Sequence, residues 1–214
     1  MKALIVFGGW AGHEPDKVAD VLAGALRESG AAVEMSNTLD AFNQLEPLVD
    51  LDLIVPVWTM GKLAGEQGKN LLAAVAEHGA GIAGVHGGMG DAFREHTGFQ
   101  FMVGGQFVAH VGGKIDYRVH IVDHADDVTA GLGHFDVTSE QYYMHVDPSN
   151  HVLATTTVEH NGCTMPVVWK RTYGKGRVFY SSLGHAAAEF AVPEVLTIIR
   201  RGMLWAAAGK GAAK

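Results

Sequence analysis

Short apolar segments alternate with segments of helical spacing over the first 85 residues, and this alternation constrains the fold more than any other feature. The apolar runs are apolar on both faces, which is typical of parallel strands covered by helices on both sides. We predict strands at 2–7, 31–35, 51–58 and 81–85, and helices at 16–28, 39–48 and 65–78. The order strand, helix, strand, helix predicts a parallel α/β sheet with right-handed crossovers.

The pattern changes after about residue 100, where the apolar segments become shorter and several alternate with polar residues. We predict strands at 117–122, 135–138, 152–158, 167–170 and 177–181, in an antiparallel extension or an excursion from the same sheet. A helix at 193–208 follows, with an apolar stripe that ends near Trp205. Without a repeat, a linker or a low-complexity run, residues 1–208 are expected to form a single domain and 209–214 a frayed tail.

Composition excludes several classes of protein. The formal net charge is −7, which argues against a nucleic-acid or anionic-membrane partner. The 48% of apolar residues is enough for a buried core, and one cysteine excludes a disulfide framework or a cysteine-based zinc site. The N-terminal apolar run is too short for a signal peptide or a membrane span. We therefore expect a soluble, cytoplasmic protein, and its 12 histidines need an explanation.

Histidines follow three of the four strands whose exits carry distinctive residues. His13 comes after the first predicted strand, His86 after 81–85 and His185 after 177–181, whereas Trp58 ends the strand at 51–58. Ligands of open α/β sheets bind outside the carboxyl ends of the strands, so these imidazoles are candidates for one site. Each of them has a plainer interpretation as a histidine satisfied by backbone hydrogen bonds.

Two further segments carry polar groups in the second half. His110 follows a glycine-rich segment at 104–107, which we predict to be a loop, and Glu140 begins a run that ends with His145. Three imidazoles and a carboxylate suit zinc or another first-row divalent ion. Each ligand would come from its own loop, and no local motif supports the set. Glu140 has an alternative role as a surface salt-bridge partner.

Several other candidates carry weaker arguments. The segment 84–88 has the form of a nucleophile elbow with imidazole at its centre, and Cys163 lies in an expected turn and is predicted to be inert. The glycines near residue 8 lack a clean G-x-G-x-x-G, so neither a nicotinamide nor a flavin cofactor is expected. Trp10 and Trp58 are expected to be packing residues, although in a cleft they would offer stacking faces for a pyranose ring. The remaining histidines are interpreted as surface or strand residues.

An ordered set of motifs resembles the ThuA-like (trehalose utilisation) family over nearly the whole chain, from residue 1 to 205. The motifs are centred on His13, His86, His110, Glu140 and His185, as in Gly84-Val85-His86-Gly87-Gly88. The resemblance implies a flavodoxin-like three-layer fold of the class I glutamine amidotransferase type, with a mostly parallel sheet. It also implies that His86 stands where an amidotransferase carries its cysteine and that His185 stands near the triad histidine. Without that thiol, glutaminase activity is not expected.

The resemblance implies a sugar-catabolic enzyme acting on a 3-keto glycoside or disaccharide such as oxidised trehalose, by elimination, hydrolysis or isomerisation. A divalent ion, zinc or manganese, would polarise the ketone. The expected metal ligands are His13, His86, His110 and His185. The expected catalytic residues are Glu140, with His145 as a substitute. The expected substrate-binding residues are Trp10, Trp58, Gln106, Tyr142 and Tyr143. A sugar oxidoreductase would supply the keto sugar, and homo-oligomers are an open alternative.

Two other functions stay open at this stage. The first is a non-catalytic sugar-binding or regulatory protein on an amidotransferase-like scaffold that has lost its cysteine nucleophile. It predicts saturable sugar binding without turnover. The second is a residual hydrolase that uses His86 or water, which predicts ammonia release from glutamine.

Overall fold

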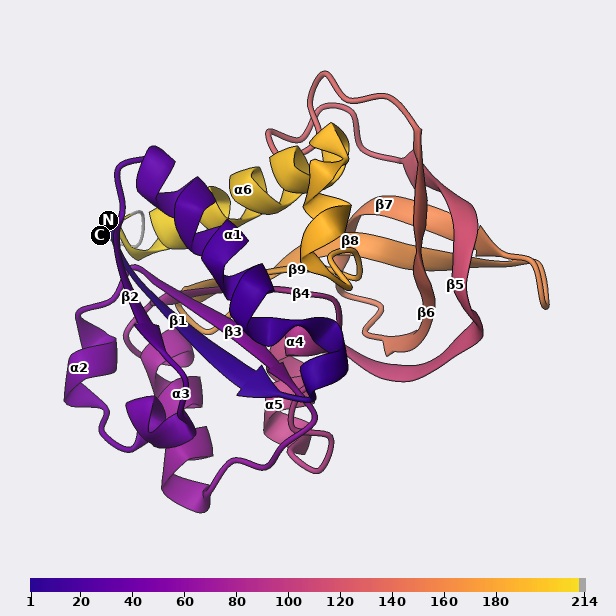
Figure 1. Ribbon diagram of the computed structural model, residues 1–214. Coiled ribbons are helices and arrows are strands. Elements are labelled where there is room, and N and C mark those ends of the chain that lie inside the picture. The colour runs from indigo at the N-terminus through magenta and orange to yellow at the C-terminus, as the bar shows by residue number, and fades with distance from the viewer. Residues whose placement is uncertain (212–214) are drawn as a thin grey trace.

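Nine strands form one mixed sheet in the order β2-β1-β3-β4-β9-β8-β7-β5-β6 (Figure 1). The computed structural model describes residues 1–211. The first five strands of that order run parallel to one another. They are β2 (Ala32–Ser36), β1 (Lys2–Gly9), β3 (Leu53–Thr59), β4 (Gly81–Val85) and β9 (Gly176–Ser181). Their carboxyl ends therefore meet at one edge of the sheet, where the candidate ligands follow.

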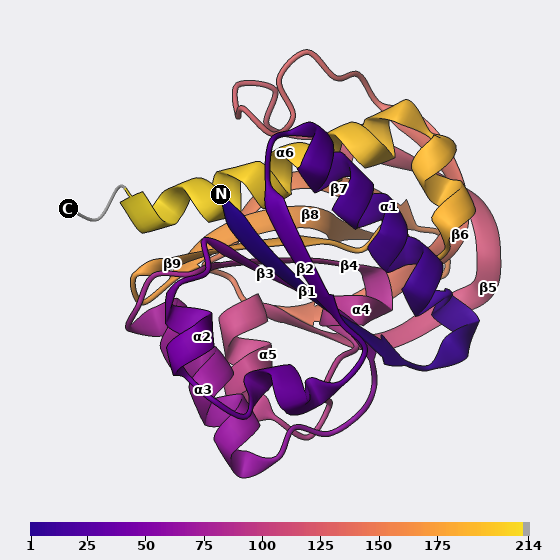
Figure 2. The same cartoon turned by 60° about the vertical axis from the view of Figure 1, so that its left-hand side comes forward.

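Helices cover both faces of the parallel half (Figures 1 and 2). One face packs against α1 (Pro15–Glu28) and α6 (Pro193–Ala207) through a core that includes Leu22 and Ile198. The opposite face packs against α2 (Glu46–Val49), α3 (Gly65–Ala76) and α5 (Thr97–Val103). Burial on both sides explains why the central strands β3 and β4 are apolar over almost their whole length, whereas the edge strand β2 is partly exposed and carries Glu34.

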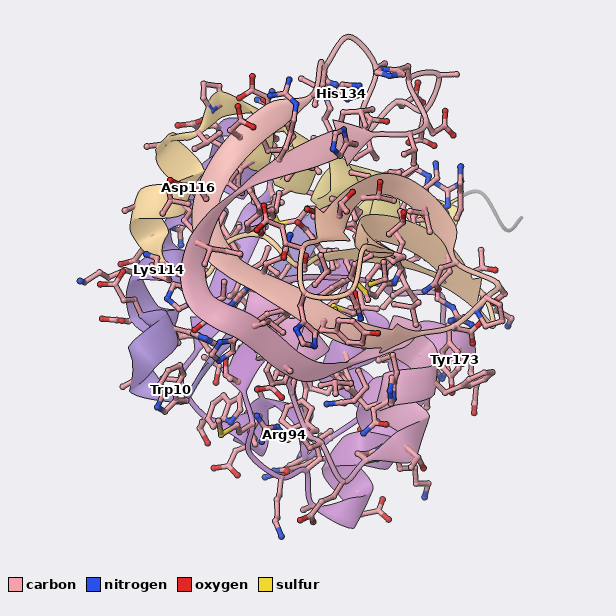
Figure 3. The ribbon with its side chains drawn as sticks, turned by 90° about the vertical axis from the view of Figure 1, so that its right-hand side faces the viewer. Trp10, Arg94, Lys114, Asp116, His134 and Tyr173 are labelled. Atoms are coloured by element: carbon pink, nitrogen blue, oxygen red, sulfur yellow. The ribbon has the colours of Figure 1, made fainter. Side chains whose placement is uncertain are left out.

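The other four strands are antiparallel and extend the sheet beyond β9. They are β8 (Cys163–Tyr173), β7 (His151–Val158), β5 (Gly105–Ile121) and β6 (Phe135–Val146). β5 and β6 form a long hairpin that arcs over the end of the molecule, at the right of Figure 1 and facing the viewer in Figure 3. The arc returns part of β6 toward the carboxyl ends of the parallel strands.

The predicted α/β architecture is confirmed for the parallel half, but the sheet as a whole is mixed rather than mostly parallel. The predicted helix at 39–48 is divided into a 3₁₀ turn, Leu39–Phe42, and α2. β5 and β6 are much longer than the strands predicted at 117–122 and 135–138, so His110 and Glu140 lie on strands and not on loops. Their glycines and charged residues hid the strand pattern, because one face of the hairpin lies against water.

Three short elements complete the chain. α4 (His86–Gly90) and two 3₁₀ helices, η1 (Ala11–His13) and η3 (Ala187–Ala191), follow β4, β1 and β9. At the C-terminus, a further 3₁₀ turn, the fourth in residues 1–211, spans Ala208–Gly211, where the Lys210 ammonium donates to the carbonyl oxygens of Val49 and Leu51. The tail expected to fray thus has regular structure to Gly211, and 212–214 lie outside the described residues. Among residues 1–211, no helix is long and apolar enough to cross a bilayer.

Candidate functional site

Three histidines and one glutamate converge at the carboxyl edge of the parallel strands. His13 follows β1, His86 follows β4, His185 follows β9, and Glu140 reaches in from β6 of the hairpin. All four residues are buried, and one donor atom of each lies within 4.8 Å of the donor atoms of the others. Residues far apart in the sequence thus form a compact cluster, which we call the His₃Glu cluster.

The spacing of the donor atoms suits a metal ion. Glu140 Oε2 lies 3.1 Å from His86 Nε2, 3.3 Å from His185 Nδ1 and 3.6 Å from His13 Nε2. The Nε2 of His86 is also 3.2 Å from the Nδ1 of His185. Two ligands of a tetrahedral zinc ion, each bonded at about 2.0–2.1 Å, lie about 3.3 Å apart. The four separations are close to this value, and the remaining two, from His13 to the other imidazoles, are within 4.8 Å.

Hydrogen bonds behind two of the rings orient their nitrogens. His86 Nδ1 lies 2.7 Å from the carbonyl oxygen of Ser182, which can only accept, so Nδ1 carries the proton. The Nε2 of a neutral His86 is then left with a lone pair directed at the cluster. His13 Nδ1 lies 2.8 Å from the hydroxyl of Thr59, the residue that ends β3. A hydroxyl can donate or accept, so this hydrogen bond orients the ring without fixing its tautomer. Metal-binding histidines use such partners to fix the ring plane and, where the partner can only accept, the tautomer.

The charge state of the His₃Glu cluster also suits a cation. Burial, followed by the charges of His86 and His185, lowers the pKa of His13 from 6.5 to about 3. Burial and His86 likewise lower the pKa of His185. For Glu140, burial acts to raise the pKa, but the hydrogen bond and charge of His86 and the nearby His185 and His110 outweigh it and hold the pKa at about 2. Divalent ions bind an ionised carboxylate and unprotonated imidazole nitrogens, and the lowered pKa values favour these states for Glu140, His13 and His185.

The turn after β4 presents His86 in a strained backbone conformation. His86 has φ of 44°, in the left-handed region that costs a non-glycine residue free energy. A Cβ at Gly88 would lie 2.9 Å from the Cα of Val57, so this turn requires glycine for its close approach to β3. The buried Tyr180 hydroxyl donates to the His86 carbonyl oxygen at 3.0 Å, and the Tyr142 ring packs on the imidazole with 3.9 Å between centroids. These contacts hold the side chain in the His₃Glu cluster.

Two aromatic side chains with exposed surface lie beside the His₃Glu cluster. His110 on β5 has a side chain that is 41% exposed, and its Nε2 lies 3.8 Å from Glu140 Oε1. Trp10 is 48% exposed, and its ring meets that of His13 edge to face at 4.7 Å. A bulge in β5 between His110 and Lys114 lies opposite the strand segment that carries Glu140. In Figure 3, Trp10 and Lys114 lie along the same side of the hairpin.

The remaining predicted residues lie at different distances from this centre. Tyr142 contacts His86, as described above, whereas Trp58 is half-buried in the core beside Gly8 and Gly61. His145 is exposed and lies an odd number of residues from Glu140 along β6, on the opposite face of the strand. His145, the expected substitute for Glu140 as an acid or base, therefore lies away from the His₃Glu cluster.

Three other predicted residues lie outside the His₃Glu cluster. Gln106 is paired with His145 across the hairpin, and its side-chain amide donates to the carbonyl oxygen of Phe107. Tyr143 lies on the face of β6 opposite Glu140 and meets the Asn161 amide at 3.5 Å. Cys163, the one cysteine, begins β8 in a half-buried position.

Sequence reasoning missed the groups that orient the cluster. Neither Thr59 nor the carbonyl oxygen of Ser182 is among the predicted site residues, although Thr59 ends β3 and Ser182 directly follows β9. A hydroxyl at the exit of β3, between two exits that carry histidines, was the available signal for Thr59. A backbone carbonyl leaves no trace in the sequence.

The fold and the His₃Glu cluster define an α/β protein of amidotransferase-like architecture in which imidazoles and a carboxylate occupy the carboxyl edge of the sheet. The chain belongs to the ThuA family, described as trehalose utilisation, whose family model matches residues 2–206. A solved ThuA-like protein of Parabacteroides merdae has 20% sequence identity and a TM-score of 0.78, covering 98% of this chain and 90% of that one. One from Bacteroides uniformis has 18% identity and a TM-score of 0.80, covering 96% and 91%.

The likeness extends to a glutaminase. The glutaminase domain of Trypanosoma brucei CTPS has 11% identity and a TM-score of 0.55, with 100% of this chain and 95% of that chain covered. At these identities the likeness concerns the fold alone. No curated protein matches the sequence. Chemistry must therefore be argued from the residues themselves.

Proposed function

We propose that this protein is a sugar-catabolic enzyme that acts on a 3-keto glycoside or disaccharide by metal-assisted acid–base chemistry. The observation that carries the proposal is the convergence of His13, His86, His185 and Glu140 with separations that fit one divalent ion. Membership of the trehalose utilisation family supports a carbohydrate substrate. Oxidised trehalose, supplied by a sugar oxidoreductase, is the example that we favour.

The four members of the His₃Glu cluster would be the metal ligands. Glu140 is therefore proposed as a ligand rather than as the acid–base group expected from sequence, because its Oε2 lies within 3.6 Å of three imidazole nitrogens. A bound zinc or manganese ion would polarise the ketone oxygen and so acidify the neighbouring C–H bonds. His110 would lie outside the ligand set, since its nearest approach is 3.8 Å to the other carboxylate oxygen.

His110 is the proposed acid–base group. Its imidazole is exposed at the mouth of the site, where an incoming substrate would meet it. In elimination, His110 would take the proton from C2 of the sugar, and the electron pair would form the C1–C2 double bond. The C1–O bond would break, and the aglycone oxygen would take the proton that His110 had received from C2, so that the aglycone leaves as an alcohol. In isomerisation, His110 would deliver the C2 proton to C3 while the hydroxyl proton on O2 passes to O3, so that the ketone moves from C3 to C2.

The sugar would be oriented by the aromatic rim. Trp10 is 48% exposed and adjoins His13, so its face is available for stacking against a pyranose ring. Trp58 is less suited to that role because its ring packs inside the fold. We therefore favour Trp10 as the substrate-binding tryptophan.

The test combines elemental analysis with proton exchange. Untagged protein, purified without chelator, is expected to hold close to one zinc or manganese ion per chain, and Glu140→Ala and His86→Ala should lose most of it. A methyl 3-keto-glucoside in deuterated water should exchange its C2 proton in the presence of the wild-type protein. His110→Gln should keep the metal but lose at least about 100-fold in exchange rate.

A second cluster supplies the control for the metal measurement. Asp123, Asp126 and His151 also lie within 4.8 Å of one another at the surface, where Lys170 already pairs with Asp126. His151→Ala should leave the metal content unchanged. Wild-type protein that stays free of metal after incubation with zinc, manganese and cobalt ions would refute the metal mechanism.

A non-catalytic sugar-binding protein is the second candidate. It is favoured by the closed character of the His₃Glu cluster, since four protein donors around a zinc ion are typical of structural sites and catalytic zinc sites keep an open position. This candidate predicts saturable sugar binding by the metal-loaded protein with no proton exchange and no turnover. An exchange rate above that of the buffer would exclude it.

A further inference from the structure

Glu189 holds the backbone on which His185 stands. Its Oε2 accepts hydrogen bonds from the backbone N–H groups of Gly184, at 3.1 Å, and His185, at 2.9 Å. Glu189 lies on η3, the 3₁₀ helix that directly follows the His185 loop. Gly184 itself has a left-handed φ of 93°. One carboxylate oxygen therefore fixes two consecutive peptide units at the exit of β9.

His185 is the member of the His₃Glu cluster most sensitive to its backbone. It faces Glu140 and His86 with Nδ1, whereas His13 and His86 face Glu140 with Nε2. The same two side-chain torsions place both ring nitrogens, but Nδ1 lies closer to the Cα atom than Nε2 does. A displacement of the peptide at residue 185 therefore moves the donor atom almost directly.

Fold stability alone does not explain the carboxylate at 189. Its second oxygen, Oε1, is shielded from solvent and has no hydrogen-bond partner within residues 1–211. The nearby Tyr117 hydroxyl is likewise shielded from solvent, and burial, then the charge of Glu189, raises the pKa of Tyr117. Buried oxygens without partners destabilise a fold. Proteins tolerate such groups chiefly at sites where function requires them.

The segment that follows His185 is also bound by the residue next to His13. The Oε2 of Glu14, which follows His13 directly, accepts from the backbone N–H of Ala187 at 3.3 Å. The His13 and His185 loops are thereby joined through a carboxylate that belongs to neither ligand. The histidine loops consequently have a fixed spacing before any ion binds.

We propose that Glu189 is a positioning residue that preorganises His185 for metal binding. The inference rests on the proposed function, because it assigns a role at the same site. It concerns hydrogen bonding and not charge: an acceptor oxygen at position 189 suffices. Glu189→Gln, which keeps an acceptor oxygen, should therefore behave like the wild type, and Glu189→Ala should not.

Two measurements test the proposal, and the first needs no metal. Amide hydrogen exchange of Gly184 and His185 in the metal-free protein should accelerate at least about five-fold in Glu189→Ala and stay near the wild-type rate in Glu189→Gln. The second is the Kd for cobalt ion alone, which should rise about 10–100-fold in Glu189→Ala and less than about three-fold in Glu189→Gln. Glu95→Ala is the matched control, since it removes an exposed carboxylate paired only with Lys62.

The outcomes separate this proposal from the one before it. Unchanged exchange of the two amides in Glu189→Ala, or an unchanged cobalt Kd in a folded variant, overturns the positioning role. If wild-type protein binds no cobalt, the proposed function fails, while the exchange rates still decide whether Glu189 holds the loop. If Glu189→Ala does not fold, Glu189→Asp takes its place, because its shorter side chain withdraws the acceptor by about one methylene and should show the same two changes.

Discussion

The Nδ1–H of His86 donates to the carbonyl oxygen of Ser182 at 2.7 Å, and this hydrogen bond orients the ring so that Nε2 faces Glu140 and His185. We predict that Nδ1 of His86 carries a proton in the metal-free protein, because the carbonyl oxygen of Ser182 can only accept. Long-range ¹H–¹⁵N correlation spectra of the ring nitrogens report this directly. A protonated Nε2 with a bare Nδ1 would contradict the orientation described above, because that ring could not donate to Ser182.

The packing of His13 against the turn after β4 gives a second prediction. A Cβ at Gly87 would lie 2.5–2.6 Å from the His13 ring and 2.9 Å from the Thr59 hydroxyl. Gly87→Ala should therefore displace His13 and raise the Kd for zinc about 10-fold or more. Gly24→Ala is the control, because a Cβ at Gly24 of α1 meets nothing within 4 Å. Zinc affinity in Gly87→Ala equal to that of the control would show that His13 is not a ligand.

Gly24→Ala carries its own expectation for stability. Alanine in the interior of a helix is favoured over glycine by roughly 0.5–1 kcal/mol. The control variant should thus unfold at a slightly higher urea concentration than the wild type, with unchanged zinc affinity. An increase in stability without a change in zinc affinity would show that the two measurements distinguish an effect on the fold from an effect on the His₃Glu cluster.

Tyr180 gives a prediction about the strained turn. Its buried hydroxyl donates to the carbonyl oxygen of His86, whose φ is 44°. Tyr180→Phe leaves that carbonyl oxygen without its donor and should lower the free energy of unfolding by about 1–3 kcal/mol. Urea denaturation measures the change, with Tyr173→Phe, at a half-buried position on β8, as the control. A change below about 0.5 kcal/mol would mean that the turn does not need the hydroxyl.

Acid should destabilise the metal-free protein. The pKa of His13 is about 3 in the fold against an ordinary 6.5, so between these pH values the unfolded chain binds a proton that the folded chain does not. Stability therefore falls as the pH drops through this window. Glu140 acts in the same direction below its ordinary 4.5, since its pKa in the fold is about 2 and its contribution is lost on acidification.

Urea denaturation at a series of pH values between 7 and 4 tests the sign. His13→Gln removes the first group and should flatten the dependence between pH 6.5 and 4.5, where Glu140 stays ionised in both states. An identical slope in His13→Gln and the wild type would assign the acid sensitivity to other groups. His151→Gln serves as the control because His151 is an exposed histidine paired with Asp123.

The parallel half of the fold could be predicted from sequence because its pattern is local. Each buried strand is a continuous apolar run that ends at glycine or a turn, as in the segment from Lys2 to Gly9. Once the strands are parallel, their carboxyl ends share one edge, and His13, His86 and His185 are brought together by topology alone. The apolar pattern of the strands, together with the rule that ligands bind at the carboxyl edge of a parallel sheet, was enough to predict that three of the four cluster residues lie together.

Glu140 could be singled out from sequence, but its role could not. Its entry into the cluster depends on the register of β5 with β6, which includes a bulge between His110 and Lys114. A shift of one residue would turn Glu140 away and bring His145 to the other face. Pairing over such a distance is set by tertiary packing, so the position of Glu140 among the three histidines, with His110 at the exposed edge, is seen only in the structure.

The position of β9 has a consequence for the order of assembly. β9 lies between β4 and β8 in the middle of the sheet, yet it is the last strand of the chain. A nascent polypeptide whose residue 185 has not yet emerged from the ribosome therefore lacks both the central strand and the histidine that follows it. The proposed ligand set would therefore be complete only after all nine strands of the sheet have been synthesised.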